Sequence, residues 1–267
     1  MKERKREQID FYDKLRGKAL EEDEAEYDRL TSNRKFYSVA RGSRTFINSW
    51  LLQRCSNKRV LDYGCGTGGI SLLLLKNNAT VAGIDISGES ISKTRNIAIL
   101  DGVDKNASFF IMDAENLAFD NDSFDIIVCT GILHHLDIQK AFAELARVLK
   151  PNGQIVCGEP LAHNPIIQLY RRMTPHLRTK WEVEHILTKS SIRLAGRYFS
   201  RVETRFFHLS TLAAVPFRNL PGFSLTLSFL EAVDEVILKL PLLKWQAWQI
   251  VLILSQPNKS LFKPQGA

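Results

Sequence analysis

The segment RVLDYGCGTGGISLLLL, residues 59 to 75, decides the fold. An apolar run containing one acid, Asp62, leads into glycines at every second position, and a second apolar run follows. This order predicts a buried strand, a sharp turn and a helix. Because glycine lets the chain turn tightly and lets a ligand lie against the main chain, the turn is the first candidate for a binding site.

The same alternation of strand and helix continues along the chain. Five strands and three helices are expected in the middle of the sequence, and two more strands follow an irregular stretch. The strands are VLDYG, TVAGIDIS, SFFIMDA, FDIIVCTGILHHL, QIVCGEP, RVETRFFHLS and WQAWQIVLILSQP. The helices are GGISLLLLKN, SGESISKTRNIAILDG and DIQKAFAELARVLKPNG, the last ended by Pro151 and Gly153. Alternating strands and helices predict an α/β fold, a doubly wound and largely parallel sheet.

Four stretches organise the chain around this sheet. Residues 1–55 are expected to form an N-terminal helical lid, with a sparse apolar stripe that includes Leu20 and Tyr27. Residues 56–160 are the ligand-binding core. Residues 161–257 supply a helical insertion and the last two strands of the same domain, and residues 258–267 are a loose tail. Within the third stretch, residues 223–243 are apolar around most of a helix circumference, so we expect burial against the sheet or a dimer partner.

Composition bounds the class of protein. The chain has 267 residues, 45% of them apolar, which is enough for a substantial core. Its net charge of +7 gathers after residue 150 without forming a basic arm, so we expect a solvated basic surface. Cys55, Cys65, Cys129 and Cys157 have no metal-site spacing and are expected as buried thiols. Without an apparent secretion signal or long apolar run, the sequence predicts a cytoplasmic protein.

Acidic residues close three successive strands beside the glycine turn. The glycines alone satisfy both the dinucleotide spacing GxGxxG and the spacing GxGxG. Asp62, two residues before the first glycine, would repel a pyrophosphate and hold a cationic amino group. Asp85 ends the second strand, where a carboxylate can take both ribose hydroxyls, and Asp113 follows the third, within reach of an adenine amine. Amino group, ribose and adenine together describe S-adenosylmethionine.

These motifs resemble a known family. RVLDYGCGTG, GIDIS, FIMDAENLAF, FDIIVCTGILHHL and ARVLKPNGQIVCGEP are similar, in order and spacing, to the motifs of class I S-adenosylmethionine-dependent methyltransferases. The small-molecule branch, which includes quinone and natural-product enzymes, is the nearest match, over about residues 58–160. The resemblance implies a Rossmann-like, seven-stranded sheet whose last strand is antiparallel.

The resemblance also implies roles for single residues. Asp62, Gly64, Gly66 and Gly68 would line the methionine end of the cofactor. The remaining cofactor residues would be Asp85 at the ribose hydroxyls, Ile86 on the adenine ring, Asp113 and Ala114 at the adenine edge, and Thr130 and Gly131 beside the sulfonium.

Methyl transfer is a displacement at an activated carbon, so the protein mainly aligns the reactants and excludes water. A base is needed only for a protonated acceptor. His134 and His135 follow the fourth strand and are the candidate catalytic residues, either as a base or as packing against the cofactor or the next helix. The sequence leaves open which of the two faces the pocket.

The acceptor pocket is expected to take residues from the N-terminal helices and from the insertion. Candidate substrate-binding residues are Tyr37, Glu159, His163, Arg171 and Arg172. The arginines would grip a carboxylate or phosphate, or else form salt bridges that hold the insertion to the body. Aromatic residues such as Phe36 and Trp50 could line an apolar pocket for an aromatic or lipid-like acceptor, but core packing explains most of them better. No metal site is predicted.

The acceptor is expected to be a small, apolar or aromatic metabolite. Methylation of an oxygen is favoured over methylation of nitrogen or carbon, because oxygen acceptors are more frequent in the family. The chain reads TGIL after its fourth strand and lacks the turn of base-amine methyltransferases, so no nucleic acid partner is expected. Alternatives are a lipid or quinone C-methyltransferase at a membrane surface, a silent cofactor-binding module and a nicotinamide-dependent oxidoreductase. Membrane contact is not favoured, and the protein is expected as a monomer or homodimer.

Overall fold

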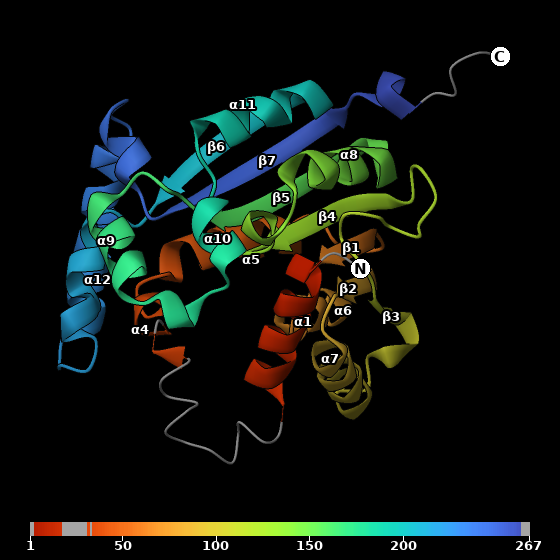
Figure 1. The fold of residues 1–267 in the computed structure, drawn as a ribbon, viewed down its shortest axis with the longest axis horizontal. Helices are drawn as coiled ribbons and strands as arrows, with labels where there is room; N and C mark the ends of the chain where they lie inside the picture. Colours follow the sequence, from red (N-terminus) through yellow and green to blue (C-terminus); the bar gives the residue numbers. More distant parts are fainter. Residues whose placement is uncertain (1–2, 18–30, 33, 263–267) are drawn as a thin grey trace.

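The computed structural model describes residues 3–17, 31–32 and 34–262. Figure 1 shows strands and helices alternating along most of this length. The strands are β1 (Arg59–Tyr63), β2 (Thr80–Asp85), β3 (Ala107–Ile111), β4 (Phe124–Thr130), β5 (Leu149–Pro160), β6 (Phe199–Phe207) and β7 (Gln249–Pro257). The helices are α1 (Glu3–Arg16), α4 (Arg34–Tyr37), α5 (Arg41–Leu52), α6 (Gly69–Leu75), α7 (Gly88–Leu100), α8 (Ile138–Val148), α9 (Pro165–Met173), α10 (Lys180–Glu184), α11 (Lys189–Tyr198) and α12 (Phe223–Ile237).

All seven strands form one sheet in the order β3-β2-β1-β4-β5-β7-β6. β1 pairs in parallel with β2 on one side and with β4 on the other, whereas β7 runs antiparallel to both β5 and β6. The predicted doubly wound sheet of seven strands with an antiparallel last strand is confirmed. The strand order reverses between β1 and β4, so the connections after these two strands part and leave a crevice.

Two apolar clusters cover the two faces of the sheet. Alternate residues of one strand point to opposite faces, so Val60 belongs to the cluster under α5, α6 and α7, and Leu61 belongs to the cluster under α8. The central strands are buried on both faces, as their continuous apolar runs predict. All four cysteines are free and buried, as expected. The core thus fixes the strand ends on which the site is built.

The end of α8 differs from the prediction. The helix stops at Val148, and Leu149 already begins β5, opposite Phe124 of β4. Both of these side chains are fully buried. Pro151 and Gly153 therefore lie inside the first part of the strand and do not end the helix. The helix ends at Val148, three residues before Pro151, because burial of Leu149 favours an extended chain there.

The outer faces of α9 and α12 are apolar and exposed. Leu225, Phe229 and Val236 of α12 are between 65% and 79% exposed, at a spacing that places them along one side of the helix. The opposite side carries Leu227, which packs in a small cluster with Ile167 of α9. Burial of the whole 223–243 segment against the sheet is therefore wrong, and a dimer partner for its outer face stays a prediction.

Several predictions fall at or beyond the described ranges. Leu20 and Tyr27, expected in a helical stripe, lie outside the described residues, as do residues 263–267 of the expected tail. Residues 258–262 of that tail form a short turn, in which the Lys259 ammonium donates to the carbonyl of Ala146 at 2.9 Å. Within residues 3–17, 31–32 and 34–262, no helix has the length and apolar character needed to cross a membrane.

Candidate active site

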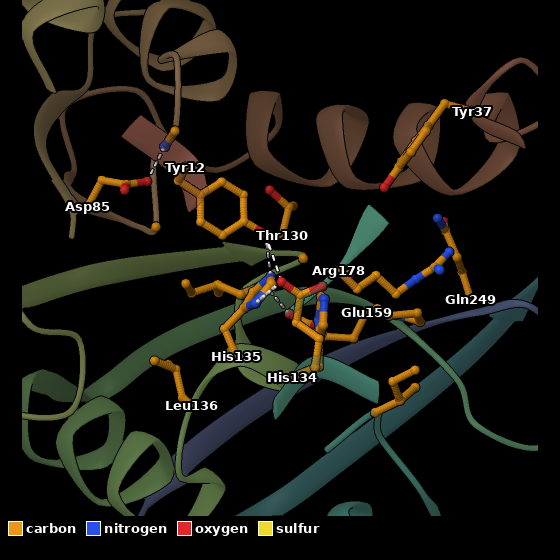
Figure 2. A pocket seen from close by; sticks show the side chains of 18 of the residues that line it. Tyr12, Tyr37, Asp85, Thr130, His134, His135, Leu136, Glu159, Arg178 and Gln249 are labelled. Carbon is orange, nitrogen blue, oxygen red and sulfur yellow. Dashed lines mark hydrogen bonds and ion pairs between the residues drawn. The ribbon is translucent and has the colours of Figure 1, made fainter. Parts of the chain in front are cut away.

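A cavity of about 770 Å³ lies at the carboxyl ends of the parallel strands. Most of the predicted site residues line it, and Figure 2 shows several of them. The predicted residues in its wall are Tyr37, Gly64, Gly66, Asp85, Ile86, Asp113, Ala114, Thr130, Gly131, His134, His135, Glu159 and Arg171. The structure therefore brings the candidate cofactor residues and the candidate histidines to one space.

The glycine turn follows β1 and needs its glycines. Gly64 and Gly66 have φ angles of 80° and 53°, in the left-handed region that side chains other than glycine rarely adopt. A Cβ on Gly64 would lie 2.8 Å from the Ile132 side chain, and one on Gly66 would lie 3.1 Å from the Arg16 guanidinium. The turn thus leaves bare main chain facing the cavity.

Asp85 ties the glycine turn to the end of β2. One carboxylate oxygen accepts the N–H of Gly66 and the other accepts the N–H of Ser87, both at 2.9 Å. Ser87 in turn caps α7, because its hydroxyl accepts the N–H of Ser90. Asp85 is therefore held in one orientation at the cavity edge, with its remaining lone pairs available to a ligand.

Helix α1 closes the cavity above the ends of β2 and β3, beside α7 in Figure 1. Lys5 forms ion pairs with Asp113 and Glu115, and Arg16 donates to the Ser90 hydroxyl at 2.5 Å. These contacts place α1 over the strand ends that carry Asp85 and Asp113. The sequence predicted a helical lid here, but it gave no sign of these contacts because their partners are about 75 to 110 residues apart.

His134 and Glu159 form a fixed pair at the centre of the cavity (Figure 2). One oxygen of Glu159 accepts the backbone N–H groups of Ile132 and Leu133 at 2.8 Å, and the other lies 2.7 Å from Nδ1 of His134. Because an ionised carboxylate can only accept, Nδ1 carries a hydrogen and Nε2 keeps its lone pair. Burial and the neighbouring His135 lower the pKa of His134, against the attraction of Glu159. At neutral pH the His134 ring is thus uncharged, with Nε2 unprotonated.

His135 has a different set of partners. Its Nε2 lies 3.2 Å from the Tyr12 hydroxyl, and its Nδ1 lies 3.1 Å from Glu182, close enough for an ion pair but not aligned for a hydrogen bond. Burial would raise the pKa of Glu182, but the attraction of His135 and the hydrogen bond from the Tyr12 hydroxyl help to lower it overall. His135 is therefore an anchor between α1, the strand-four loop and α10. Sequence reasoning missed Tyr12, whose position no local pattern indicates.

The two histidines and Glu182 also satisfy the spacing of a metal site. One ligand atom from each lies within 4.8 Å of the others. Nδ1 of His134 is already bound by Glu159, and His135 already contacts Tyr12 and Glu182. The arrangement can therefore be explained by contacts within the protein.

Four of the predicted residues lie apart from the cavity wall. Asp62 and Gly68 sit behind the glycine turn, and the Gly68 φ of 83° places a hypothetical Cβ 2.5 Å from Thr94. His163 is half-buried and accepts the backbone N–H of Lys189 at 3.3 Å. Arg172 is exposed on α9, whereas the preceding Arg171 is buried. None of these four residues therefore lines the cavity.

The family is shown by comparison with known proteins. A family model described as a methyltransferase domain matches residues 55–196. This match covers more than half of the chain, including the glycine turn, both acids of the cavity edge and the two histidines. The chain belongs to the class I S-adenosylmethionine-dependent methyltransferases. The cofactor of this family is S-adenosylmethionine.

Relatives of this methyltransferase differ in their names. The chain is 37% identical over 110 residues to a ubiquinone/menaquinone biosynthesis C-methyltransferase, UbiE, of Rickettsia massiliae. This match covers 39% of this chain and 44% of the relative. It is 34% identical over 134 residues to an uncharacterized methyltransferase, YcgJ, of Bacillus subtilis, covering 49% and 51%. The matches thus span about half the length of these curated relatives.

A solved structure supports the fold over a longer part of the methyltransferase. The geranyl diphosphate C-methyltransferase of Streptomyces coelicolor A3(2), solved with S-adenosyl-L-homocysteine, has a TM-score of 0.56 and 14% identity, and the match covers 80% of this chain and 79% of that one. At this identity the likeness concerns the fold alone.

The residues of the crevice suit the cofactor. The Asp62 carboxylate is 2% exposed and accepts the Ser71 hydroxyl at 2.6 Å, with no cationic partner in ion-pair range among the described residues. Burial raises the pKa of Asp62 to about 6. A buried carboxylate without a counter-charge is costly, and the cationic amino group of a bound cofactor would compensate it. Asp62, the glycine turn, Asp85 and Asp113 are the residues that would hold the cofactor.

We predict that Asp62→Asn stabilises the free protein and weakens cofactor binding. The unfolded chain releases the Asp62 proton near its ordinary pKa of 3.8, whereas the folded protein holds it until about 6, so folding weakens as pH rises through this window. Asparagine keeps an oxygen for Ser71 without the charge. Its free energy of unfolding is expected to exceed that of the wild type by up to about 3 kcal/mol at pH 7.5 and by almost nothing at pH 4. Urea unfolding at both pH values measures this, and an equal change at both would refute the buried-charge explanation.

Proposed function

We propose that this protein transfers a methyl group from S-adenosylmethionine to a hydroxyl group of a small aromatic or apolar acceptor. The observation that carries the proposal is the His134–Glu159 pair, which presents an unprotonated nitrogen to the same cavity that holds Asp85 and Asp113. When bound, the cofactor supplies a methyl group already activated by a sulfonium leaving group. The protein therefore needs to align the acceptor, remove its proton and exclude water.

The chain's own residues account for the proton. With the cofactor bound, Nε2 of His134 would take the hydroxyl proton as the acceptor oxygen gains the methyl group, and the neutral thioether would be the leaving group. Glu159 stabilises the imidazolium that results, because its carboxylate already holds Nδ1. Helix α1 and the apolar wall of the cavity keep water from the site.

The pH dependence of turnover follows from the pKa of His134. A base must be unprotonated, and burial together with His135 lowers the pKa of His134 below the ordinary 6.5. We therefore expect the acid limb of the kcat profile to be centred below pH 6.5. A kcat–pH profile measures this, and an acid limb centred above 6.5 would contradict the assignment of His134 as the base.

Labelled cofactor tests the function itself. The protein is incubated with methyl-labelled S-adenosylmethionine and a metabolite extract, and the products are separated and analysed for the labelled atom. Label on an acceptor oxygen supports the proposal, and absence of label from every small molecule would overturn it in favour of a silent cofactor-binding module.

A second candidate function is methylation of a ring carbon on a lipid-soluble quinone at a membrane surface. The exposed apolar side chains of α9 and α12, among them Leu225 and Phe229, favour it, and a relative is named as a quinone C-methyltransferase. Phospholipid vesicles that carry a quinol, added to the same incubation, separate the two functions. Label on a ring carbon, with faster transfer in the presence of vesicles, would select this candidate over O-methylation.

A further inference from the structure

Two arginines on one wall of the cavity have no acidic partner. The Arg171 side chain on α9 is 4% exposed, and its guanidinium donates to the Leu161 carbonyl at 3.0 Å. The Arg178 guanidinium donates to the carbonyl and the hydroxyl of Thr174, both at 3.0 Å. Within the described parts of the chain, no carboxylate lies within ion-pair distance of either guanidinium.

This pairing of like charges is unfavourable in the free protein. Burial and, next to it, the neighbouring charge of Arg178 lower the pKa of Arg171 to about 10, against the attraction of Tyr37. Burial also lowers the pKa of Arg178, against the attraction of Tyr170, Glu182 and Tyr37. The buried carboxylate of Glu115, by contrast, is compensated by ion pairs with Arg4 and Lys5. The two arginines thus resemble Asp62 in having no ion pair among the described residues, and an anionic ligand would compensate them.

The groups around Arg178 are also donors. Figure 2 shows the Arg178 side chain extending toward Gln249, with the Tyr37 hydroxyl pointing into the same space. Gln249 accepts the Ser43 hydroxyl through its carbonyl oxygen at 2.7 Å, which leaves its amide N–H groups free to donate. Desolvation raises the pKa of Tyr37, so its hydroxyl stays protonated and can donate. Glu159 and Glu182 also line the cavity, but His134 and His135 hold their carboxylates. The remaining donors suit a group that only accepts.

The donors lie away from the cofactor residues. In Figure 2, Asp85 is on one side of the cavity, His134 and Glu159 are in the middle, and Arg178, Tyr37 and Gln249 are on the other side. A ligand held by the arginines would therefore present its remaining atoms to His134. We propose that the methyl acceptor carries an oxyanion, a carboxylate or a phosphate, which binds between Arg171 and Arg178. As a statement about the acceptor, this rests on the proposed function. Paired guanidinium groups match the geometry of such oxyanions.

Binding of simple probes tests the anion site without methyl transfer. Benzoate, phenyl phosphate and the neutral control benzyl alcohol are titrated calorimetrically into the full chain in the absence of cofactor. We expect one of the two anions to bind at least ten-fold more tightly than benzyl alcohol, and the better anion identifies the acid as carboxylate or phosphate. Arg178→Met is expected to remove this preference, whereas Arg193→Met, which changes an exposed arginine on α11, keeps it.

The outcomes separate the site from the function. Equal binding of all three probes, or an unchanged preference in Arg178→Met, would overturn the anion site. The thermal melting and S-adenosylhomocysteine affinity of Arg178→Met verify that the variant is folded. If the anion preference depends on Arg178 but no acceptor is ever labelled, the anion site stands and the proposed function fails. If a neutral acceptor is methylated equally well by wild type and Arg178→Met, the function stands and the acidic acceptor is refuted.

Discussion

Replacing His134 by glutamine is expected to lower kcat for methyl transfer by about 10²- to 10⁴-fold, the usual contribution of a positioned general base. Glutamine has a similar reach and keeps a polar contact with Glu159, but it cannot take the acceptor's proton. Because His134 lies in the middle of the cavity, away from Asp85, the affinity for S-adenosylhomocysteine should stay within about three-fold of the wild type. Single-turnover kinetics and calorimetry measure the two quantities.

Two further variants make this result specific. His176→Gln removes an exposed histidine from the turn before α10 and should leave kcat unchanged. Glu159→Gln retains a carbonyl oxygen for the N–H groups of Ile132 and Leu133 but turns an amide N–H toward Nδ1 of His134. The ring would then carry its hydrogen on Nε2 and would no longer present an unprotonated nitrogen to the cavity. The kcat of Glu159→Gln should therefore fall nearly as far as that of His134→Gln. Full activity of His134→Gln would show that the acceptor reaches the site already ionised or that another group is the base.

Replacing Asp85 by alanine is expected to weaken S-adenosylhomocysteine binding by at least 100-fold. A carboxylate that accepts two ribose hydroxyls contributes two charge-assisted hydrogen bonds, each worth about 1.5–3 kcal/mol. The same carboxylate holds the Gly66 N–H, so its loss also releases the glycine turn. Calorimetric titration, carried out well below the melting temperature of the variant, measures the affinity.

Asp85→Asn distinguishes the two roles of this residue. Asparagine keeps one acceptor oxygen and the side-chain volume, so binding should be weaker than in wild type and stronger than in Asp85→Ala. Asp104→Ala removes an exposed acid from the turn before β3 and is the matched control, with no expected change. Unchanged affinity in Asp85→Ala would remove Asp85 from the cofactor site.

The sequence predicted the sheet, and it placed most of the candidate cofactor residues at the edge where the structure has them, because both depend on local patterns. Buried parallel strands read as apolar runs, and the turn after β1 needs glycine at Gly64 and Gly66 for steric reasons. The acids Asp85 and Asp113 follow directly from the strand ends, since the register of a parallel sheet places them at one edge.

The acceptor side was predicted less well because it combines distant segments. Tyr12 and Gln249 reach the cavity from opposite ends of the chain, and no spacing in the sequence links them. Arg172 was expected in the site, but α9 begins after the Asn164 cap and turns Ile167 and Arg171 inward, four residues apart. The phase of this helix therefore places Arg172 outside. Helical spacing alone would have predicted that Arg172 is exposed, but only if the first residue of α9 had been known.

The exposed face of α12 illustrates a second limit. Its sequence is apolar around most of its circumference, which favours burial on all sides. In the structure only Leu227 and Asp234 are buried, with Asp234 accepting the N–H groups that open the preceding turn. Apolar content alone does not indicate which side of a helix faces the protein.

The central claim is that one cavity holds the cofactor against Asp85 and Asp113 and presents its reactive end to His134. A crystal structure of the protein with S-adenosylhomocysteine tests this most directly. We expect the ribose hydroxyls on Asp85, the adenine beside Asp113 and the sulfur facing the His134–Glu159 pair. A cofactor bound elsewhere, or one whose sulfur faces away from His134, would contradict the account.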